Sequence, residues 1–208
     1  MLCRSARLER LFFMKNMKVC IFASSSNRID GEFTRAASEL GSLLARAGME
    51  VVYGGGGIGL MGRLADAVIA GGGKITGVIP GFMIDEGWNH TSVEDMIVTP
   101  DMGERKRRMF ELSDAVVAMP GGVGTLEELT EAITLKQLGL FNGPVVILNT
   151  INYYDSLIEF LDNMIDGNFL RDEHKIIWKV VNTPGEVISY LKEYDGWIDD
   201  PRSIAHIY

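Results

Sequence analysis

A glycine-rich stretch that ends in carboxylates is the first candidate for chemistry. Residues 120–128 read PGGVGTLEE, between an apolar run at 115–119 and a segment with helical spacing. Glycines in front of a helix let backbone N–H groups approach an anion, and a phosphate suits such a cradle. The carboxylate of Glu128 could then meet the sugar attached to that phosphate. No Lys-Ser/Thr pair follows the glycines, so the stretch is not a Walker P-loop.

A structural role for the same residues is the alternative. Thr125 and Glu128 stand three apart at the expected start of the helix, which is the spacing of a capping box. In that arrangement the threonine hydroxyl accepts one free N–H group and the glutamate reaches back for another. The spacing alone is compatible with both roles.

A run of charged residues, 104–108 (ERKRR), stands inside an otherwise acidic chain. A solvated helix face is the ordinary explanation of such a run. Helical spacing, however, places Arg105 on the face of Met109 and Leu112, which should pack inward. An arginine at the rim of that apolar stripe can hold a phosphate or a ribose with two hydrogen bonds.

A second glycine-rich stretch, residues 54–62 (GGGGIGLMG), also follows an apolar run and formally matches GxGxxG. We expect Gly56 and Gly57 to bind the substrate, together with Ser25 of the loop after the first run, whose hydroxyls could instead cap a helix. NAD or FAD binding is disfavoured, because the motif follows the second run and the third ends without the acid that holds a ribose. A tight turn that binds nothing is the other alternative.

The elements that position these residues alternate along the chain. Short apolar runs, most of them apolar on both faces as in covered strands, occupy 18–23, 50–53, 74–79, 95–98, 115–119, 145–149 and 177–181. Helical segments are predicted at 31–47, 59–71, 103–112, 125–139, 152–166 and 184–193. The alternation predicts an α/β fold, a Rossmann-like three-layer sandwich with a parallel sheet of about seven strands flanked by helices. Ligands should bind where strands end, after Ala23, Tyr53, Ile79 and Met119.

Composition and charge exclude several classes of partner and ligand. The 208 residues include 20 Lys+Arg and 28 Asp+Glu, and the resulting net charge of −8 argues against a nucleic-acid partner. No apolar run approaches the roughly 18 residues of a membrane span, so we expect no membrane partner. Two cysteines are too few for a disulfide framework, and we expect a reduced, cytoplasmic protein. The histidines share no metal-ligand spacing, so we expect no metal and place them at the surface or in loops.

The length fits one domain. We expect a single Rossmann-like nucleotide-binding domain at 17–194, a disordered N-terminal extension at 1–16 and a C-terminal tail at 195–208. The first residues carry three arginines but too short an apolar run for a signal peptide. Met14 and Met17 are therefore candidates for the natural start beside Met1.

Taken together, these motifs resemble the LOG (Lonely guy) family, the cytokinin riboside 5′-monophosphate phosphoribohydrolases. The resemblance extends from about residue 18 to about residue 191 and rests on residues 54–62, 104–106, 113–128 and 137–139. It implies a Rossmann-like fold in a homodimer or larger homo-oligomer. It also implies hydrolysis of the N-glycosidic bond of AMP, or of its N6-prenylated forms, to free base and ribose 5-phosphate without a cofactor.

The family's functional residues fall on residues already singled out. The resemblance implies catalytic roles for Arg105 and Glu128, and Lys106 matches the family's second basic residue. The family's phosphate loop falls on Gly121, Gly122, Gly124 and Thr125.

The chain departs from the family pattern at a few positions. Ser24 stands where many relatives have glycine, Gly103 where a histidine is frequent, and Val123 where an aromatic residue is frequent. The arginine and the glutamate are kept, so these departures bear on recognition of the base and leave the reaction class unchanged.

Cleavage of the bond between C1′ and the purine builds positive charge on the ribose. We expect Glu128 to stabilise that charge and to orient a water molecule. Arg105 would hold the phosphate and sugar or stabilise the departing purine. A non-catalytic nucleotide-binding or carrier module on the same fold is the second hypothesis, and release of adenine from AMP distinguishes the two.

Overall fold

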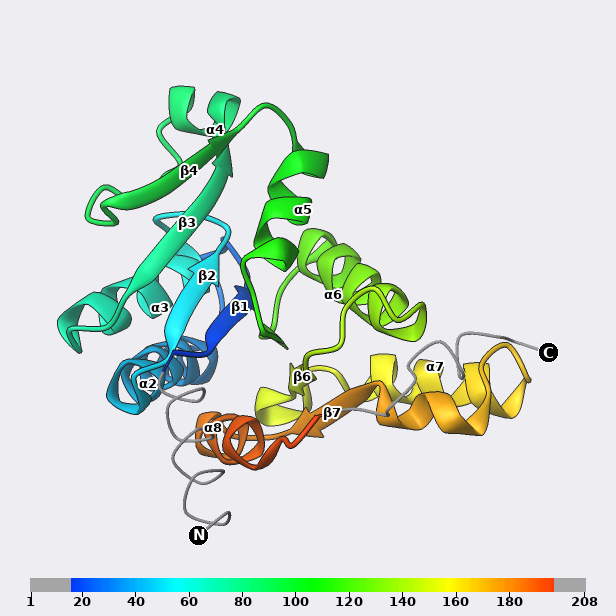
Figure 1. Ribbon diagram of the computed structural model, residues 1–208. Coiled ribbons are helices and arrows are strands. Elements are labelled where there is room, and N and C mark those ends of the chain that lie inside the picture. The colour runs from blue at the N-terminus through cyan, green and yellow to red at the C-terminus, as the bar shows by residue number, and fades with distance from the viewer. Residues whose placement is uncertain (1–15, 197–208) are drawn as a thin grey trace, which may run out of the picture.

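Strands and helices alternate along the chain as the apolar runs predict (Figure 1). The computed structural model describes residues 16–196, so the predicted extension and tail lie almost entirely outside it. The strands are β1 (Lys18–Phe22), β2 (Glu50–Tyr53), β3 (Ile75–Pro80), β4 (Asp95–Thr99), β5 (Ala115–Ala118), β6 (Val145–Leu148) and β7 (Trp178–Val181). The α-helices are α2 (Gly31–Ala47), α3 (Gly59–Ala70), α4 (Gly81–Asp85), α5 (Met102–Glu111), α6 (Val123–Gln137), α7 (Asp155–Asp166) and α8 (Pro184–Glu193). The described residues also contain two 3-10 helices, η1 (Thr150–Asn152) and η2 (Asp172–Ile176).

The strands form one parallel sheet in the order β4-β3-β2-β1-β5-β6-β7. The chain moves outward from β1 to β4, returns to β5 beside β1, and then moves outward on the other side. The strand order therefore reverses between β1 and β5, and ligands of such sheets bind at the carboxyl ends there. The predicted Rossmann-like sheet is confirmed.

Helices cover both faces of the sheet, and β1 shows how the sequence specifies this. Val19 and Ile21 belong to the core that the sheet forms with α2, α3 and α8. Cys20 and Phe22 belong to the core on the opposite face, with α5, α6 and α7. Successive side chains of a strand point to opposite faces, so a strand covered on both sides is apolar at every position.

Two features near the predicted ligand loops differ from the predicted elements. The five-residue helix α4 was not predicted, because a single turn that begins directly after Pro80 is too short to show a helical period. Helix α6 begins at Val123, two residues before the predicted start. Among the described residues, no helix combines the length and the apolar character needed to cross a membrane.

The expectation that the histidines lie at the surface or in loops is confirmed for His90, which lies in a loop, and was wrong for His174. His90 and His174 lie in a loop and a 3-10 helix, but both are buried. Each ring accepts a backbone N–H at Nδ1, from Ser92 at 3.2 Å and from Arg171 at 3.1 Å. The spacing of residues in the sequence does not predict these short-range hydrogen bonds. His206 lies outside the described residues.

Helix α3 packs directly on the loop that follows β1, and Gly59 permits this. The backbone N–H groups of Leu60 and Met61 donate to the carbonyl of Ser24, at 2.9 and 3.3 Å. Gly59 has φ +66°, and a Cβ there would overlap the backbone of Ser25. The first N–H groups of α3 are thus bonded to protein, and this glycine serves a close backbone approach.

The substitution Gly59→Ala should therefore destabilise the protein more than a positive φ alone explains. We expect the free energy of unfolding to fall by about 3 kcal/mol, from left-handed strain and overpacking together. Gly72→Ala is the matched control, because Gly72 has φ +68° with no atom within 4 Å of the added Cβ. This control substitution should lower the free energy of unfolding by only about 1 kcal/mol. Urea denaturation measures both, and equal losses would contradict this explanation.

Candidate active site

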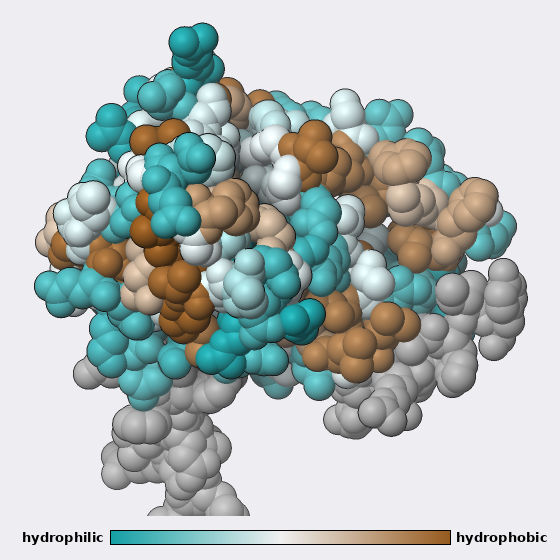
Figure 2. Space-filling model, turned by 90° about the horizontal axis from the view of Figure 1, so that it is seen from above, coloured by the Kyte–Doolittle hydropathy of each residue, from teal (hydrophilic) through white to brown (hydrophobic). Residues whose placement is uncertain are grey.

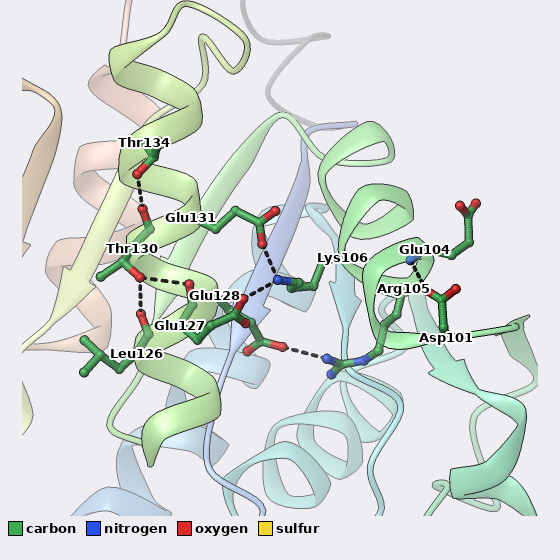
Figure 3. Close-up of polar contacts among 10 residues, drawn as sticks. All are labelled: Asp101, Glu104, Arg105, Lys106, Leu126, Glu127, Glu128, Thr130, Glu131 and Thr134. Carbon is green, nitrogen blue, oxygen red and sulfur yellow. Dashed lines mark hydrogen bonds and ion pairs between the residues drawn. The ribbon is translucent and has the colours of Figure 1, made fainter.

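Helices α5 and α6 bring Arg105 and Glu128 together. Helix α5 begins after Asp101, whose side chain accepts the N–H of Glu104 at 2.8 Å. Arg105 then lies one turn before Met109, and both side chains are buried, in line with the predicted apolar face. Nη1 of Arg105 donates to Oε1 of Glu128 at 2.7 Å (Figure 3).

Arg105 is fixed from three directions. Besides Glu128, its Nε donates to the carbonyl of Val78 at 3.1 Å and its Nη2 to that of Gly54 at 3.5 Å. A Cβ at Gly54 would overlap the guanidinium, so only glycine fits there with Arg105 in this position. The side chain is thus anchored by β3, by the loop after β2 and by α6.

A cavity of about 410 Å³ lies beside this ion pair, at the carboxyl end of β1. Its polar side chains come from Ser24, Ser25, Ser26, Arg105, Thr125 and Glu128. Its apolar side chains include four methionines, Met61, Met83, Met102 and Met109. The cavity therefore combines one polar wall with a flexible, polarizable wall that can contact a flat ring.

Apolar side chains are also exposed at the end of the molecule that carries α4, near the apolar wall of the cavity. Figure 2 looks onto this end and shows hydrophobic residues in separate patches among hydrophilic ones. Phe82 and Trp88 are about half exposed, and their rings pack edge to face at 6.4 Å. Met83, between them in the sequence, lines the cavity.

The glycine-rich loop after β5 ends at the N-terminus of α6. Gly122 is the N-cap and no side chain caps the helix. Gly122, Gly124 and Thr125 line the cavity, and the side chain of Thr125 packs against Gly121. The capping-box alternative was wrong, because Thr125 lies inside the helix and Glu128 bonds to Arg105.

Of the other predicted site residues, some line the cavity and others lie outside it. Ser25 lines the cavity, whereas Gly57 borders a neighbouring cleft and donates its N–H to Trp88 at 2.9 Å. Gly56 pairs with Asn89 in an isolated bridge. Lys106 also points from α5 to α6, where it forms ion pairs with Glu127 and Glu131 and does not line the cavity (Figure 3).

The sequence did not reveal every residue around the cavity. Met83 lies on the unpredicted α4, and Tyr153, after β6, donates its hydroxyl to the carbonyl of Gly121 at 2.6 Å. The loop after β6 was not among the predicted ligand loops. Since β6 neighbours β5, the order of the strands would have pointed to it.

Burial and charge act in opposite directions on Glu128. Burial raises the pKa of this carboxyl, whereas the adjacent Arg105 guanidinium lowers it, and the net direction is upward. A buried carboxylate with a raised pKa, next to a fixed arginine in a cavity, is typical of catalytic sites.

Comparisons with known proteins agree with this geometry. A family model described as "Possible lysine decarboxylase" matches residues 61–191. The probable cytokinin riboside 5′-monophosphate phosphoribohydrolase LOGL2 of Oryza sativa subsp. japonica is 40% identical over 177 residues, which are 85% of this chain and 72% of the relative. The cytokinin riboside 5′-monophosphate phosphoribohydrolase LOG3 of Arabidopsis thaliana is 38% identical over 180 residues, 86% of this chain and 84% of the relative.

A solved structure provides a match at the level of the fold. The molybdenum cofactor carrier protein of Chlamydomonas reinhardtii superposes with a TM-score of 0.67 and 22% sequence identity. The match covers 86% of this chain and 97% of that one. At this identity the likeness shows a shared fold only.

Removing Glu128 should leave the charge of Arg105 buried without its partner. We expect Glu128→Ala to lower the free energy of unfolding by about 3 kcal/mol or more. Glu127→Ala is the matched control on the same helix, because Glu127 is 52% exposed and its partner Lys106 keeps Glu131. That change should cost less than about 1 kcal/mol. Comparable losses in urea denaturation would show that the buried pair does not hold the two helices together.

Proposed function

We propose that this chain, which belongs to the LOG family of cytokinin riboside 5′-monophosphate phosphoribohydrolases, hydrolyses the N-glycosidic bond of a purine nucleoside 5′-monophosphate. The substrate is AMP or an N6-prenylated AMP, and the products are the free base and ribose 5-phosphate. The buried Arg105–Glu128 pair carries the proposal, because it borders a cavity between the glycine-rich loop and the loop after β1.

Glu128 is the group best placed to support the reaction. Only its Oε1 is bonded to Arg105, and Oε2 has no hydrogen-bond donor among the described residues. That oxygen can face the C1′ atom, where positive charge develops as the bond to the purine breaks. It can also orient the attacking water, whose proton needs an acceptor as the new C–O bond forms.

Arg105 has a positioning role in this scheme. Three protein acceptors occupy its Nε, Nη1 and Nη2 atoms, so the guanidinium is held before any ligand binds. It keeps Glu128 in one orientation and favours its charged form. Its remaining N–H groups can contact the sugar or the phosphate.

The phosphate is expected at the start of α6. Gly121 and Gly122 supply backbone N–H groups, and the helix N-terminus carries partial positive charge. Binding energy from the phosphate, which does not react, then holds C1′ beside Glu128. Four methionines provide the apolar wall for the purine and for any N6 substituent.

The description of the family model names a different reaction, and the cavity offers no support for it. Its lining contains no lysine among the described residues. Burial lowers the pKa of Lys136 to about 8, but this residue donates to the carbonyl of Gly143 near the C-terminal end of α6. The homodimer that the family implies stays a prediction, for which the exposed Val123 and Leu126 of α6 offer apolar surface.

Replacing the Glu128 carboxylate by an amide should remove most of the turnover and spare the fold. We expect Glu128→Gln to lower kcat for AMP by about a hundredfold or more, because the amide accepts from Arg105 but cannot stabilise positive charge. Glu127→Gln should keep near wild-type activity. Chromatography of released adenine measures both. Wild-type turnover in Glu128→Gln would overturn the assignment, and AMP binding without adenine release by the wild-type protein would favour the carrier hypothesis.

The pH dependence of kcat/KM should report the ionisation of the Glu128 carboxyl. The reaction needs ionised Glu128, so kcat/KM should fall as pH decreases through its pKa. Because burial raises that pKa above the ordinary value of 4.5, the acid limb should lie above it. The AMP phosphate also titrates near pH 6, so the affinity for ribose 5-phosphate is measured in parallel to separate the two ionisations. An acid limb of kcat/KM at or below the ordinary glutamate pKa would contradict this account.

A further inference from the structure

Three consecutive carbonyls precede α6, and each accepts a hydrogen bond from a protein donor. The hydroxyl of Tyr154 donates to Met119 at 2.7 Å, and that of Tyr153 donates to Gly121 at 2.6 Å. Between them, the N–H of Ser24 donates to the carbonyl of Pro120 at 3.3 Å. The loop therefore presents no free carbonyl from residues 119–121.

Fixing a carbonyl also fixes the N–H group of the next residue. In a planar trans peptide the two groups point in opposite directions, and no cis peptide occurs in the described chain. The bond at Pro120 thus sets the direction of the Gly121 N–H, and the bond at Gly121 sets that of the Gly122 N–H. Within residues 16–196, neither N–H has a protein acceptor, and Gly122 lines the cavity.

The two tyrosines differ in what they fix. The peptide that follows the Met119 carbonyl ends at Pro120, which has no N–H to direct. Tyr154 is also buried, so its hydroxyl mainly satisfies a buried carbonyl. Tyr153 is 45% exposed, and the peptide that it holds carries the N–H of Gly122, a residue that lines the cavity.

A strained turn places Tyr153 against this loop. Ile151 and Asn152 have φ values of 45° and 64°, and the left-handed region is unfavourable for a β-branched residue. Asn149 stabilises the turn, because its Oδ1 accepts the N–H of Tyr154 at 2.6 Å. The ring of Tyr153 packs edge to face on Phe33 of α2 at 5.5 Å. The chain thus maintains an unfavourable backbone that directs a half-exposed tyrosine to a glycine carbonyl.

We propose that Tyr153 is a positioning residue: through the Gly121 carbonyl, its hydroxyl directs the Gly122 N–H toward the phosphate of the ligand. This role rests on the proposed function, because it requires a phosphate on the loop. Tyr153 touches neither the phosphate nor the reacting atoms in this assignment. It acts by removing the freedom of one peptide group.

The test compares Tyr153→Phe with Tyr194→Phe. The control removes the same chemistry at another place, since the Tyr194 hydroxyl donates to the carbonyl of Asn142 at 2.9 Å, beyond the C-terminal end of α6. Calorimetry measures the affinity for ribose 5-phosphate and for adenine, which carries no phosphate. Tyr153→Phe should bind ribose 5-phosphate about five- to tenfold more weakly and adenine as tightly as the wild-type protein. Tyr194→Phe should change neither.

A second variant separates positioning from stability. Tyr154→Phe should lower the melting temperature more than Tyr153→Phe, because it leaves a buried carbonyl without its donor. The proposal is overturned if Tyr153→Phe binds ribose 5-phosphate like the wild-type protein, if adenine affinity falls equally, or if the wild-type protein does not bind ribose 5-phosphate. Tight ribose 5-phosphate binding that depends on Tyr153, without hydrolysis of AMP, would refute only the proposed function.

Discussion

The buried ion pair between Arg105 and Glu128 is the constraint on which the rest of the site depends. Two charges removed from water cost several kcal/mol each, and replacing such a pair by apolar residues is often neutral or stabilising. Its presence at the point where the strand order reverses is therefore better explained by chemistry than by stability. The glycine at 54 and the position of α5 against β3 both follow from the space and the acceptors that Arg105 requires.

The two glycine-rich stretches, similar in composition, have different physical roles. In the stretch after β2, missing Cβ atoms let the chain pack on itself, as Gly54 does for Arg105 and Gly59 for the loop after β1. In the loop after β5, the carbonyls are bonded to protein, and the N–H groups of Gly121 and Gly122 have no acceptor among residues 16–196. A GxGxxG pattern cannot distinguish these cases, because the difference lies in what surrounds the backbone.

Most of the fold could be predicted from the sequence, because a strand covered on both faces must be apolar throughout. The predicted runs agree with the seven strands to within a residue or so, and Arg105 was placed correctly beside Met109 from helical spacing. The pairing of Glu128 with Arg105 could not be derived from spacing, since it depends on how α5 and α6 are packed. Helix α4, the contacts of Lys106 with α6, and the role of Tyr153 likewise depend on segments that are distant in sequence.

The most direct test of the account is the crystal structure of the Glu128→Gln variant with AMP bound. The account predicts the phosphate on the N–H groups of Gly121 and Gly122, with C1′ of the ribose in contact with the side chain of residue 128 and the purine against the methionines. A phosphate bound instead at the glycines after β2, or a ribose turned away from residue 128, would contradict it.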